Sequence, residues 1–241
     1  TYPYRAMNTF LSIMFPEWAR AGDSALLGKN SNLLRRLKDE KLDARLRKDT
    51  NKIVEQMGGA ESLVVNGISI AERSEKENKE PYDIMRKLIL KSHGGCGVIG
   101  FAMSKENVDK ILAFPLTMVI SDGWGQGAKG SSKAHPRNYG TFPRVLARYV
   151  RERKLLSLNE AIKKMTSMPA EHFQIKDRGM LKKGKFADVT IFSYDRILDT
   201  ATFEKANQKP EGIEYVLVNG RLAVKKGKLT STRAGKILRK A

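Results

Sequence analysis

Two continuous apolar runs, separated by one amphipathic segment, constrain the fold of this chain most strongly. The runs VIGFAM (98–103) and LTMVIS (116–121) flank the segment KENVDKILAF, which Ser104 can cap as a helix and which Pro115 ends. Continuous apolar strands joined by a helix are typical of a parallel sheet that is covered on both faces. The sequence therefore predicts an α/β fold in this part of the chain.

A helical region and a β-branched run precede these segments. Over residues 15–61, leucines recur at helical spacings, which predicts an amphipathic helical region. The run SLVVNGISI (62–70) predicts a strand, although its Asn66-Gly67 pair is also a turn signal. A further helix is expected over residues 82–91.

The region after residue 141 begins with helical signals. The segment FPRVLARYVRER predicts a helix with a basic face over residues 142–153. Ser157 and Glu160 have the spacing of a capping box, which predicts the start of another helix.

Strand signals dominate the end of the chain, beyond a boundary that we place near Arg178. Residues 186–194 and 213–229 are rich in β-branched and aromatic residues. The second run contains Asn219-Gly220, a strong hairpin signal. We therefore predict that a small β module follows the α/β part.

The net charge of +19 raises the question of an anionic partner. Basic residues are concentrated in residues 129–154, where Glu152 is the single acid, and in residues 221–241, which contain no acid. Such a surface attracts nucleic acid, but a solvated lysine-rich surface explains the same composition. Because no zinc-finger, helix-turn-helix or RNA-binding aromatic pattern accompanies the charge, specific nucleic-acid binding is not expected.

The single cysteine, Cys96, excludes an intrachain disulfide and suits a reducing compartment, so we predict a cytoplasmic location. Because no apolar run reaches about 18 residues, we expect no membrane partner. Its glycine neighbours make it an accessible nucleophile on one reading, but no base or oxyanion element accompanies it. We therefore interpret Cys96 as a structural thiol. We interpret His172 as a surface or packing residue, and no HxH, HExxH or CxxC spacing occurs.

The strongest candidate site lies where the second apolar run ends. Asp122 follows that run, Gly123 permits close backbone approach, and a Gly/Ser/Lys loop leads to His135 and Arg137. A carboxylate at a strand end can bind a metal or move a proton, and a guanidinium can bind a carboxylate through two hydrogen bonds. The alternatives are a turn or capping aspartate and a surface loop with incidental cations.

Several motifs together resemble the N-acyl-D-amino-acid deacylases (D-aminoacylases) of the amidohydrolase superfamily. They are, in chain order, TYPYRAMNT, FPEWARAG, IGFAMSKENVDKIL with LTMVISDG, HPRNYGTFPRVLARYVRE, LSLNEAIKKMTSMPAEHFQIKDRGMLKKGKFADVTIF and PEGIEYVLVNG. The resemblance implies the C-terminal part of a TIM (β/α)8 barrel over residues 1–178, with a helical insertion at about 15–60. It implies a small β-sandwich module over residues 179–241.

The resemblance also implies site residues and a cofactor. It implies zinc-dependent hydrolysis of N-acyl-D-amino acids, with Asp122 as a metal ligand and as the carboxylate that moves the proton. Arg137 is expected to bind the substrate's α-carboxylate, and Tyr2 to help bind the substrate. Asn8 stands where the family usually has serine, and the role of His135 stays open.

The family's other metal ligands lie upstream of the YPY segment, at which this chain begins. The resemblance therefore implies a C-terminal portion that is inactive without an N-terminal barrel half, its expected partner besides the small-molecule substrate. The alternative is a non-catalytic basic binding or assembly module.

Overall fold

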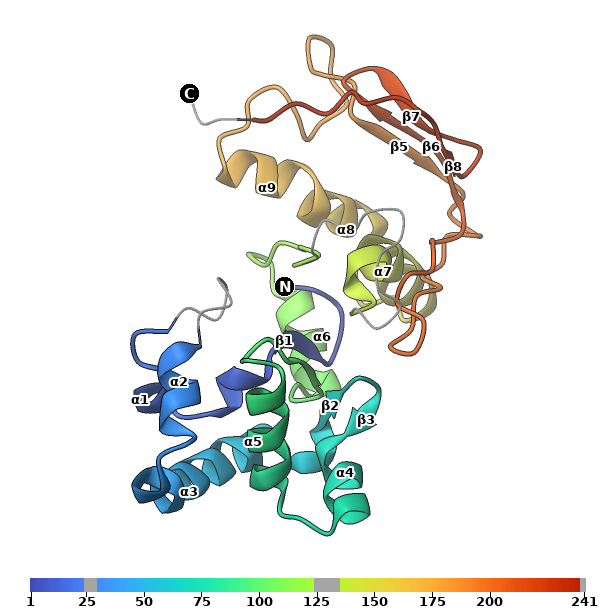
Figure 1. Ribbon diagram of the computed structural model, residues 1–241. Coiled ribbons are helices and arrows are strands. Elements are labelled where there is room, and N and C mark those ends of the chain that lie inside the picture. The colour runs from blue at the N-terminus through green and yellow to red at the C-terminus, as the bar shows by residue number, and fades with distance from the viewer. Residues whose placement is uncertain (24–29, 124–134, 239–241) are drawn as a thin grey trace. The chain divides into compact units, whose positions relative to one another are not determined.

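The computed structural model describes residues 1–23, 30–123 and 135–238, coloured along the chain in Figure 1. The described chain divides into two compact units. The insertion unit is Arg5–Ser104, and the C-terminal unit combines Thr1–Tyr4 with Lys105–Ala241. The predicted boundary near Arg178 lies inside the C-terminal unit, and it stays a prediction.

The insertion unit packs helices around a small antiparallel sheet. The sheet has the order β1-β4-β2-β3, with strands β1 (Met7–Phe10), β2 (Leu63–Val65), β3 (Ile68–Ser69) and β4 (Gly97–Gly100). Its helices are α1 (Glu17–Arg20), α2 (Ser31–Arg36), α3 (Glu40–Gln56), α4 (Ile70–Glu77) and α5 (Pro81–Lys91), with 3-10 turns η1 (Leu11–Met14) and η3 (Ala60–Ser62). These helices confirm the predicted helical character of the region and the helix over 82–91.

Local chemistry explains the turn between β2 and β3. Asn66 and Gly67 both have positive φ, at 53° and 81°, as a tight hairpin turn requires. The turn interpretation of this pair is therefore confirmed.

The core of the insertion unit contains Phe15, Tyr82 and Met85, each fully buried. Burial of such side chains is the main source of stability for this unit.

The C-terminal unit begins with helices. They are α6 (Lys105–Ala113), α7 (Arg137–Arg144), the π-helix η4 (Val145–Glu152), α8 (Leu158–Met165) and α9 (Ser167–His172). Pro143 lies inside α7, where it lacks a backbone N–H, and the wider π-helix follows directly. Val145 and Tyr149 on η4 pack with Leu112 and Ile197 in the core of this unit.

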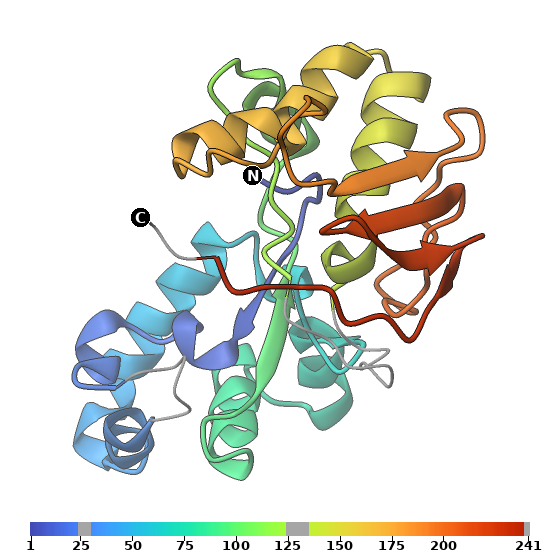
Figure 2. The same cartoon turned by 90° about the horizontal axis from the view of Figure 1, so that it is seen from above.

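A second antiparallel sheet completes the unit, and its strands lie side by side in both views (orange to red in Figures 1 and 2). The strands are β5 (Val189–Phe192), β6 (Ile213–Val218), β7 (Arg221–Lys225) and β8 (Lys228–Leu229). Asn219 and Gly220 join β6 to β7 with φ of 50° and 76°, which confirms the predicted hairpin.

The predicted parallel sheet is wrong for the described residues, in which both sheets are antiparallel. The first apolar run forms a strand only over Gly97–Gly100, between antiparallel neighbours. Residues 116–121 form no strand, and Leu116 and Ile120 are 74% and 50% exposed. Strand formation depends on a neighbour that supplies backbone partners, which hydrophobicity alone does not reveal.

The capping box at the start of α8 is confirmed. The Ser157 hydroxyl accepts from the Glu160 N–H at 3.2 Å, and the Glu160 carboxylate accepts from the Ser157 N–H at 2.9 Å. We expect Ser157→Ala to lower the free energy of unfolding by about 1 kcal/mol, because the Glu160 N–H loses its side-chain acceptor. Urea unfolding would measure the loss. Ser157→Asp, which keeps an accepting oxygen, should stay within about 0.5 kcal/mol of the unchanged chain.

The charge on η4 is used largely within the fold. Arg148 contacts Asp199, Arg151 donates to the carbonyl oxygens of Tyr194 and Ile197, and Arg153 pairs with Asp109. The arginines of the predicted basic face therefore bind groups within the fold at these positions.

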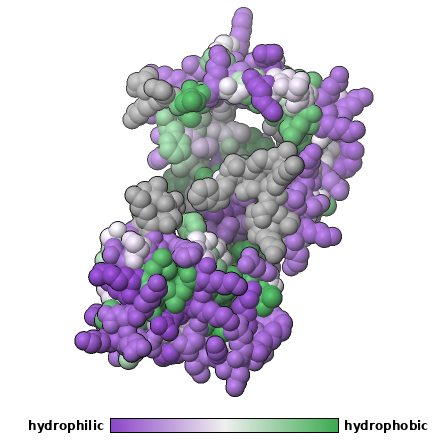
Figure 3. Space-filling view, in the orientation of Figure 1, coloured by the Kyte–Doolittle hydropathy of each residue, from purple (hydrophilic) through white to green (hydrophobic). Residues whose placement is uncertain are grey.

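Hydrophilic residues cover most of the molecular surface that Figure 3 shows. None of the helices in the described ranges combines the length and apolarity needed to cross a membrane.

Candidate active site

Three chain segments of the C-terminal unit bring Tyr2, Asp122 and Arg137 together. Tyr2 lies in the short segment Thr1–Tyr4, Asp122 follows the extended run 116–121, and Arg137 is the first residue of α7. Arg137 Nη2 lies 2.9 Å from Asp122 Oδ2. The Arg137 guanidinium also lies over the Tyr2 ring, 4.7 Å from its centroid.

Backbone hydrogen bonds align the first two segments. The Thr1 nitrogen donates to Met118 O, and the Ile120 N–H donates to Thr1 O, both at 2.8 Å. This pattern joins residue 1 to residue 119 in the manner of a parallel strand pair. The Val119 N–H donates to Lys164 O of α8, so the run is held from the other side as well. Tyr2 and Asp122 therefore leave neighbouring backbones at the same end.

A strained backbone directs the Asp122 carboxylate. Asp122 has a φ of 47°, in the left-handed region that costs most residues energy and that aspartate tolerates better than others. Gly123 then passes close to α7: a Cβ there would lie 2.9 Å from Asn138 Oδ1 and 3.2 Å from its Cα. Only glycine permits this approach without displacement. The Asp-Gly pair is thus required locally for the carboxylate to reach Arg137.

The ion pair is asymmetric in its exposure to solvent. The Arg137 side chain is 3% exposed, whereas that of Asp122 is 56% exposed. Burial raises the pKa of the neighbouring Tyr2 hydroxyl, the nearby Arg137 opposes that shift, and Asp122 adds to it. The site therefore presents a buried guanidinium that holds a carboxylate at its open side, beside a protonated phenol.

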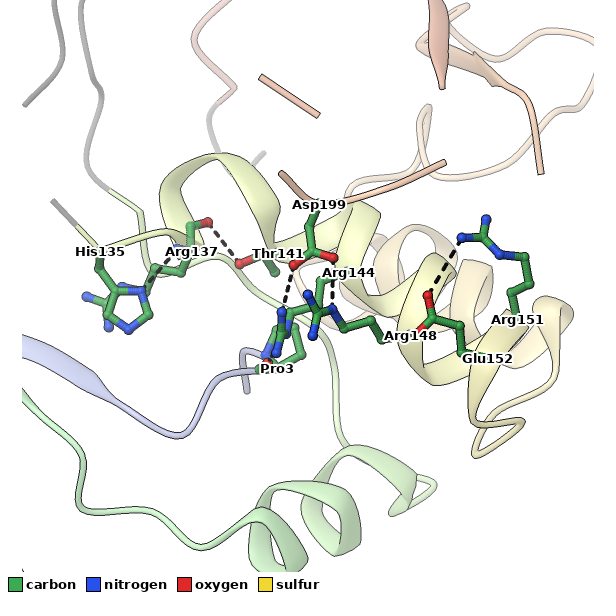
Figure 4. A network of polar contacts seen from close by, with 9 residues as sticks. All are labelled: Pro3, His135, Arg137, Thr141, Arg144, Arg148, Arg151, Glu152 and Asp199. Carbon is green, nitrogen blue, oxygen red and sulfur yellow. Dashed lines mark hydrogen bonds and ion pairs between the residues drawn. The ribbon is translucent and has the colours of Figure 1, made fainter. Parts of the chain in front are cut away.

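His135 lies at the base of this arrangement. Its ring is fully buried, and its Nδ1 accepts from the Arg137 backbone N–H at 3.0 Å. The hydroxyl of Thr141, one turn further along α7, donates to Arg137 O at 2.9 Å. Figure 4 shows His135 beside Arg137 at the start of the helix.

A buried carboxylate that the sequence analysis missed anchors α7 and η4. Asp199, with a side chain of 0% exposure, lies 2.7 Å from Arg144 Nη1 and 3.2 Å from Arg148 Nε (Figure 4). Arg144 also donates to Pro3 O at 2.9 Å and lies over the Tyr4 ring at 4.7 Å. No local sequence signal identifies the partners of Asp199, because they lie 55 and 51 positions away in the chain.

The other predicted residues lie elsewhere. Asn8 is half-buried on β1, opposite Ile99, in the insertion unit. The exposed His172 ends α9, which agrees with its interpretation as a surface residue. The Gly/Ser/Lys loop of residues 124–134, which we expected to fold over a ligand, lies outside the described residues.

Cys96 is a buried thiol in the insertion unit, and burial raises its pKa above the usual value. Because the thiolate is the reactive form, we expect iodoacetamide to alkylate Cys96 in the folded chain at least about tenfold more slowly than glutathione at pH 7.5. Mass spectrometry over time would measure the rate, and the same chain in urea should react at the rate of the free thiol. Rapid labelling of the folded chain would contradict the structural interpretation.

The site residues supply one donor suited to zinc. The Asp122 carboxylate is of the right chemical type and is open to solvent, but a zinc ion in an enzyme takes about three protein ligands. Among residues 1–23, 30–123 and 135–238, no group of three or more His, Cys, Asp or Glu side chains could hold a metal. These residues therefore do not by themselves form a metal centre.

Comparison with known proteins identifies homologues of this chain. The amidohydrolase family profile matches residues 120–224, which include Asp122, Arg137 and the strands β5 and β6. The chain is 37% identical over 174 residues to the D-aminoacylase of Alcaligenes xylosoxydans xylosoxydans, covering 72% of this chain. It is 45% identical over 144 residues to the N-acyl-D-glutamate deacylase of the same organism, covering 60% of this chain. The chain is a homologue of the N-acyl-D-amino-acid deacylases of the amidohydrolase family.

Solved structures agree with this family. A D-aminoacylase studied for the role of its binuclear metal centre superposes with a TM-score of 0.72 and 28% identity over 100% of this chain. An N-acyl-D-glutamate deacylase from Bordetella bronchiseptica, solved with zinc and a phosphonate inhibitor, gives 0.66 and 28% identity over 92% of this chain. This deacylase homologue therefore has the mixed helix-and-sheet fold of the amidohydrolases.

The match covers a part of each relative. The chain spans 34% and 28% of the two curated Alcaligenes proteins, and 42% and 38% of the two solved chains. The activity of the complete relatives is therefore considered for this chain as a proposal.

Proposed function

We propose that this chain forms the substrate-carboxylate side of a zinc-dependent hydrolase that cleaves the amide bond of N-acyl-D-amino acids. The observation that carries the proposal is the buried Arg137 guanidinium holding the open Asp122 carboxylate, in a homologue of D-aminoacylases. The relatives' names supply the substrate class, an N-acylated D-amino acid. The structure supplies a group that already binds one carboxylate.

Arg137 is proposed to bind the α-carboxylate of the substrate. Its guanidinium is fixed by burial and by the Tyr2 ring, so little side-chain entropy is lost on binding. Asp122 Oδ2 now stands 2.9 Å from Nη2, where a substrate oxygen would accept. The pair therefore implies an exchange, in which the substrate's acid replaces Asp122 on Arg137 and Asp122 becomes available for chemistry.

Asp122 is proposed to act as a metal ligand and to move the proton during hydrolysis. Its exposure leaves the carboxylate accessible to water, so it can take a proton and pass it to the leaving amine. Zinc, when bound by a complete ligand set, would lower the pKa of a water molecule. Tyr2, protonated and next to Arg137, is proposed to donate a hydrogen bond to the substrate, and Asn8 to supply a second polar contact.

The finer fold is also a proposal. We propose that residues 1–178 are the C-terminal part of a TIM barrel, with an insertion at about 15–60, and that residues 179–241 are a β-sandwich module. The parallel pairing of residue 1 with residue 119 supports adjacent barrel strands at this place. The proposed site then lies at the carboxyl end of the run 116–121, where barrel enzymes build their sites. A cytoplasmic location also stays a prediction.

Because one donor does not hold zinc, the remaining ligands are proposed to come from a barrel segment outside this sequence. We expect the 241-residue chain with zinc to give no measurable hydrolysis of N-acetyl-D-amino acids. We then add the part of D-aminoacylase that does not align with this chain, either as a separate chain or fused to it. This addition should produce turnover, which ninhydrin detection of the released free amine would measure.

The matched control for that assay is Asp122→Asn, which keeps the size of the side chain but cannot carry the proton. It should lower turnover of the assembled protein at least about a thousandfold. Robust hydrolysis by the isolated chain, or by the assembled Asp122→Asn variant, would contradict the proposal.

A further inference from the structure

His135 contacts the Tyr2 ring and the backbone of Arg137, yet the proposed function gives it no role. Its Nδ1 accepts from the backbone N–H of Arg137, the first residue of α7, at 3.0 Å. The first N–H groups of a helix have no acceptor within the helix, so an acceptor from outside fixes where the helix begins. The orientation of the His135 ring therefore sets the backbone position of Arg137.

Aromatic side chains hold that ring in its plane. The ring centroid of His135 lies 5.9 Å from that of Tyr2, 5.2 Å from that of Tyr4 and 5.0 Å from that of Phe203. The interplanar angles of 65°, 89° and 77° are those of edge-to-face contacts, the favoured arrangement for rings. Rotation of the fully buried ring would break these contacts, so its Nδ1 keeps a fixed direction.

We propose that His135 is a positioning residue, which holds Arg137 and Tyr2 in one geometry as a clamp for the carboxylate of the ligand. This inference rests on the proposed function, because it takes the same site and the same ligand class. The hydrogen bond to Nδ1 fixes the backbone of Arg137, and the edge-to-face contact fixes the ring of Tyr2. The Arg137 guanidinium lies over that ring, 4.7 Å from its centroid. As an acceptor, Nδ1 carries no proton, so the neutral ring has its proton on Nε2.

Two substitutions separate the hydrogen bond from the bulk of the ring. His135→Asn places its side-chain oxygen near the position of Nδ1 and keeps an acceptor for Arg137, whereas His135→Leu removes the acceptor. The probes are N-acetyl-D-leucine and its carboxamide analogue, which lacks the acid. Calorimetric titration of the metal-free 241-residue chain measures both affinities without turnover.

We expect His135→Leu to weaken binding of the acid about tenfold or more, and binding of the carboxamide less than about twofold. His135→Asn should retain the acid affinity within about threefold. Equal weakening of acid and carboxamide would show a merely structural role and would overturn the inference. Equal acid affinities of the two variants, or no acid binding by the unchanged chain, would overturn it too.

If the leucine variant does not fold, His135→Gln takes its place. The carboxamide of glutamine extends past the position of Nδ1, so the Arg137 N–H loses its acceptor there. It should then show the same selective loss of acid binding, and unchanged affinity would count against the inference. The result is independent of catalysis: selective binding without hydrolysis by the assembled protein would refute the proposed function and leave the role of His135 supported.

Discussion

Replacing Arg137 with methionine is expected to lower kcat/KM of the assembled protein for an N-acetyl-D-amino acid by about a hundredfold to a thousandfold. The loss of a buried, charge-assisted interaction with a carboxylate costs about 3–4 kcal/mol, which corresponds to this range. The carboxamide analogue makes no such interaction, so its kcat/KM should change less than about threefold. Steady-state kinetics with the two substrates measures the difference directly.

The stability of the variant provides its control. Methionine fills much of the volume of the arginine stem, and the abandoned Asp122 is 56% exposed, so it returns to water at little cost. The free energy of unfolding of the Arg137→Met variant should therefore differ from that of the unchanged chain by less than about 1 kcal/mol. Arg137→Lys keeps the charge but not the planar fork and should lose at least about tenfold in kcat/KM for the acid. Equal losses for acid and carboxamide would show that Arg137 does not recognise the carboxylate.

Elements set by neighbours in sequence were predicted well. The Ser157–Glu160 capping box and the Asn219-Gly220 hairpin depend on atoms within a few residues, and both are present in the structure. The helix α4 was missed, because its sequence, IAERSEKE, is short and mostly polar. Its start is set by Ser69, whose hydroxyl accepts from the Glu72 N–H at 3.0 Å.

Pairing over long distances was predicted less well. The apolar composition of residues 116–121 suggested a buried strand, but whether such a run forms a ladder depends on its neighbours in space. Its backbone hydrogen bonds go to Thr1 and Lys164, which the sequence does not identify. Residue 119 pairs with residue 1 in the manner of parallel strands, and not with the run 98–103 that the sequence analysis joined to it.

The candidate site combines both situations. The sequence placed Asp122 and Arg137 at the two ends of one loop, and the structure brings their side chains to 2.9 Å, although their roles stay predictions. The sequence did not reveal Asp199, which is separated from Arg144 by 55 positions in the chain. A motif gives the identity of residues that contact the ligand, but it does not identify the distant groups that hold those residues in place.

Asp199 is where we expect the largest loss of stability. Asp199→Ala should lower the free energy of unfolding of the C-terminal unit by about 3 kcal/mol, because Arg144, 21% exposed, is left without its carboxylate. Arg148, 44% exposed, returns to water more easily and contributes less. Urea unfolding followed by circular dichroism would measure the loss.

A surface ion pair in the same unit gives the matched control for Asp199. Glu106 lies 2.6 Å from Lys110 with both side chains at least 70% exposed, so Glu106→Ala should cost less than about 1 kcal/mol. Arg144 also holds Pro3 O, so loss of Asp199 should free the segment that carries Tyr2 and weaken acid binding as well. Similar stability losses for the Glu106 and Asp199 variants would show that this buried network does not anchor the site.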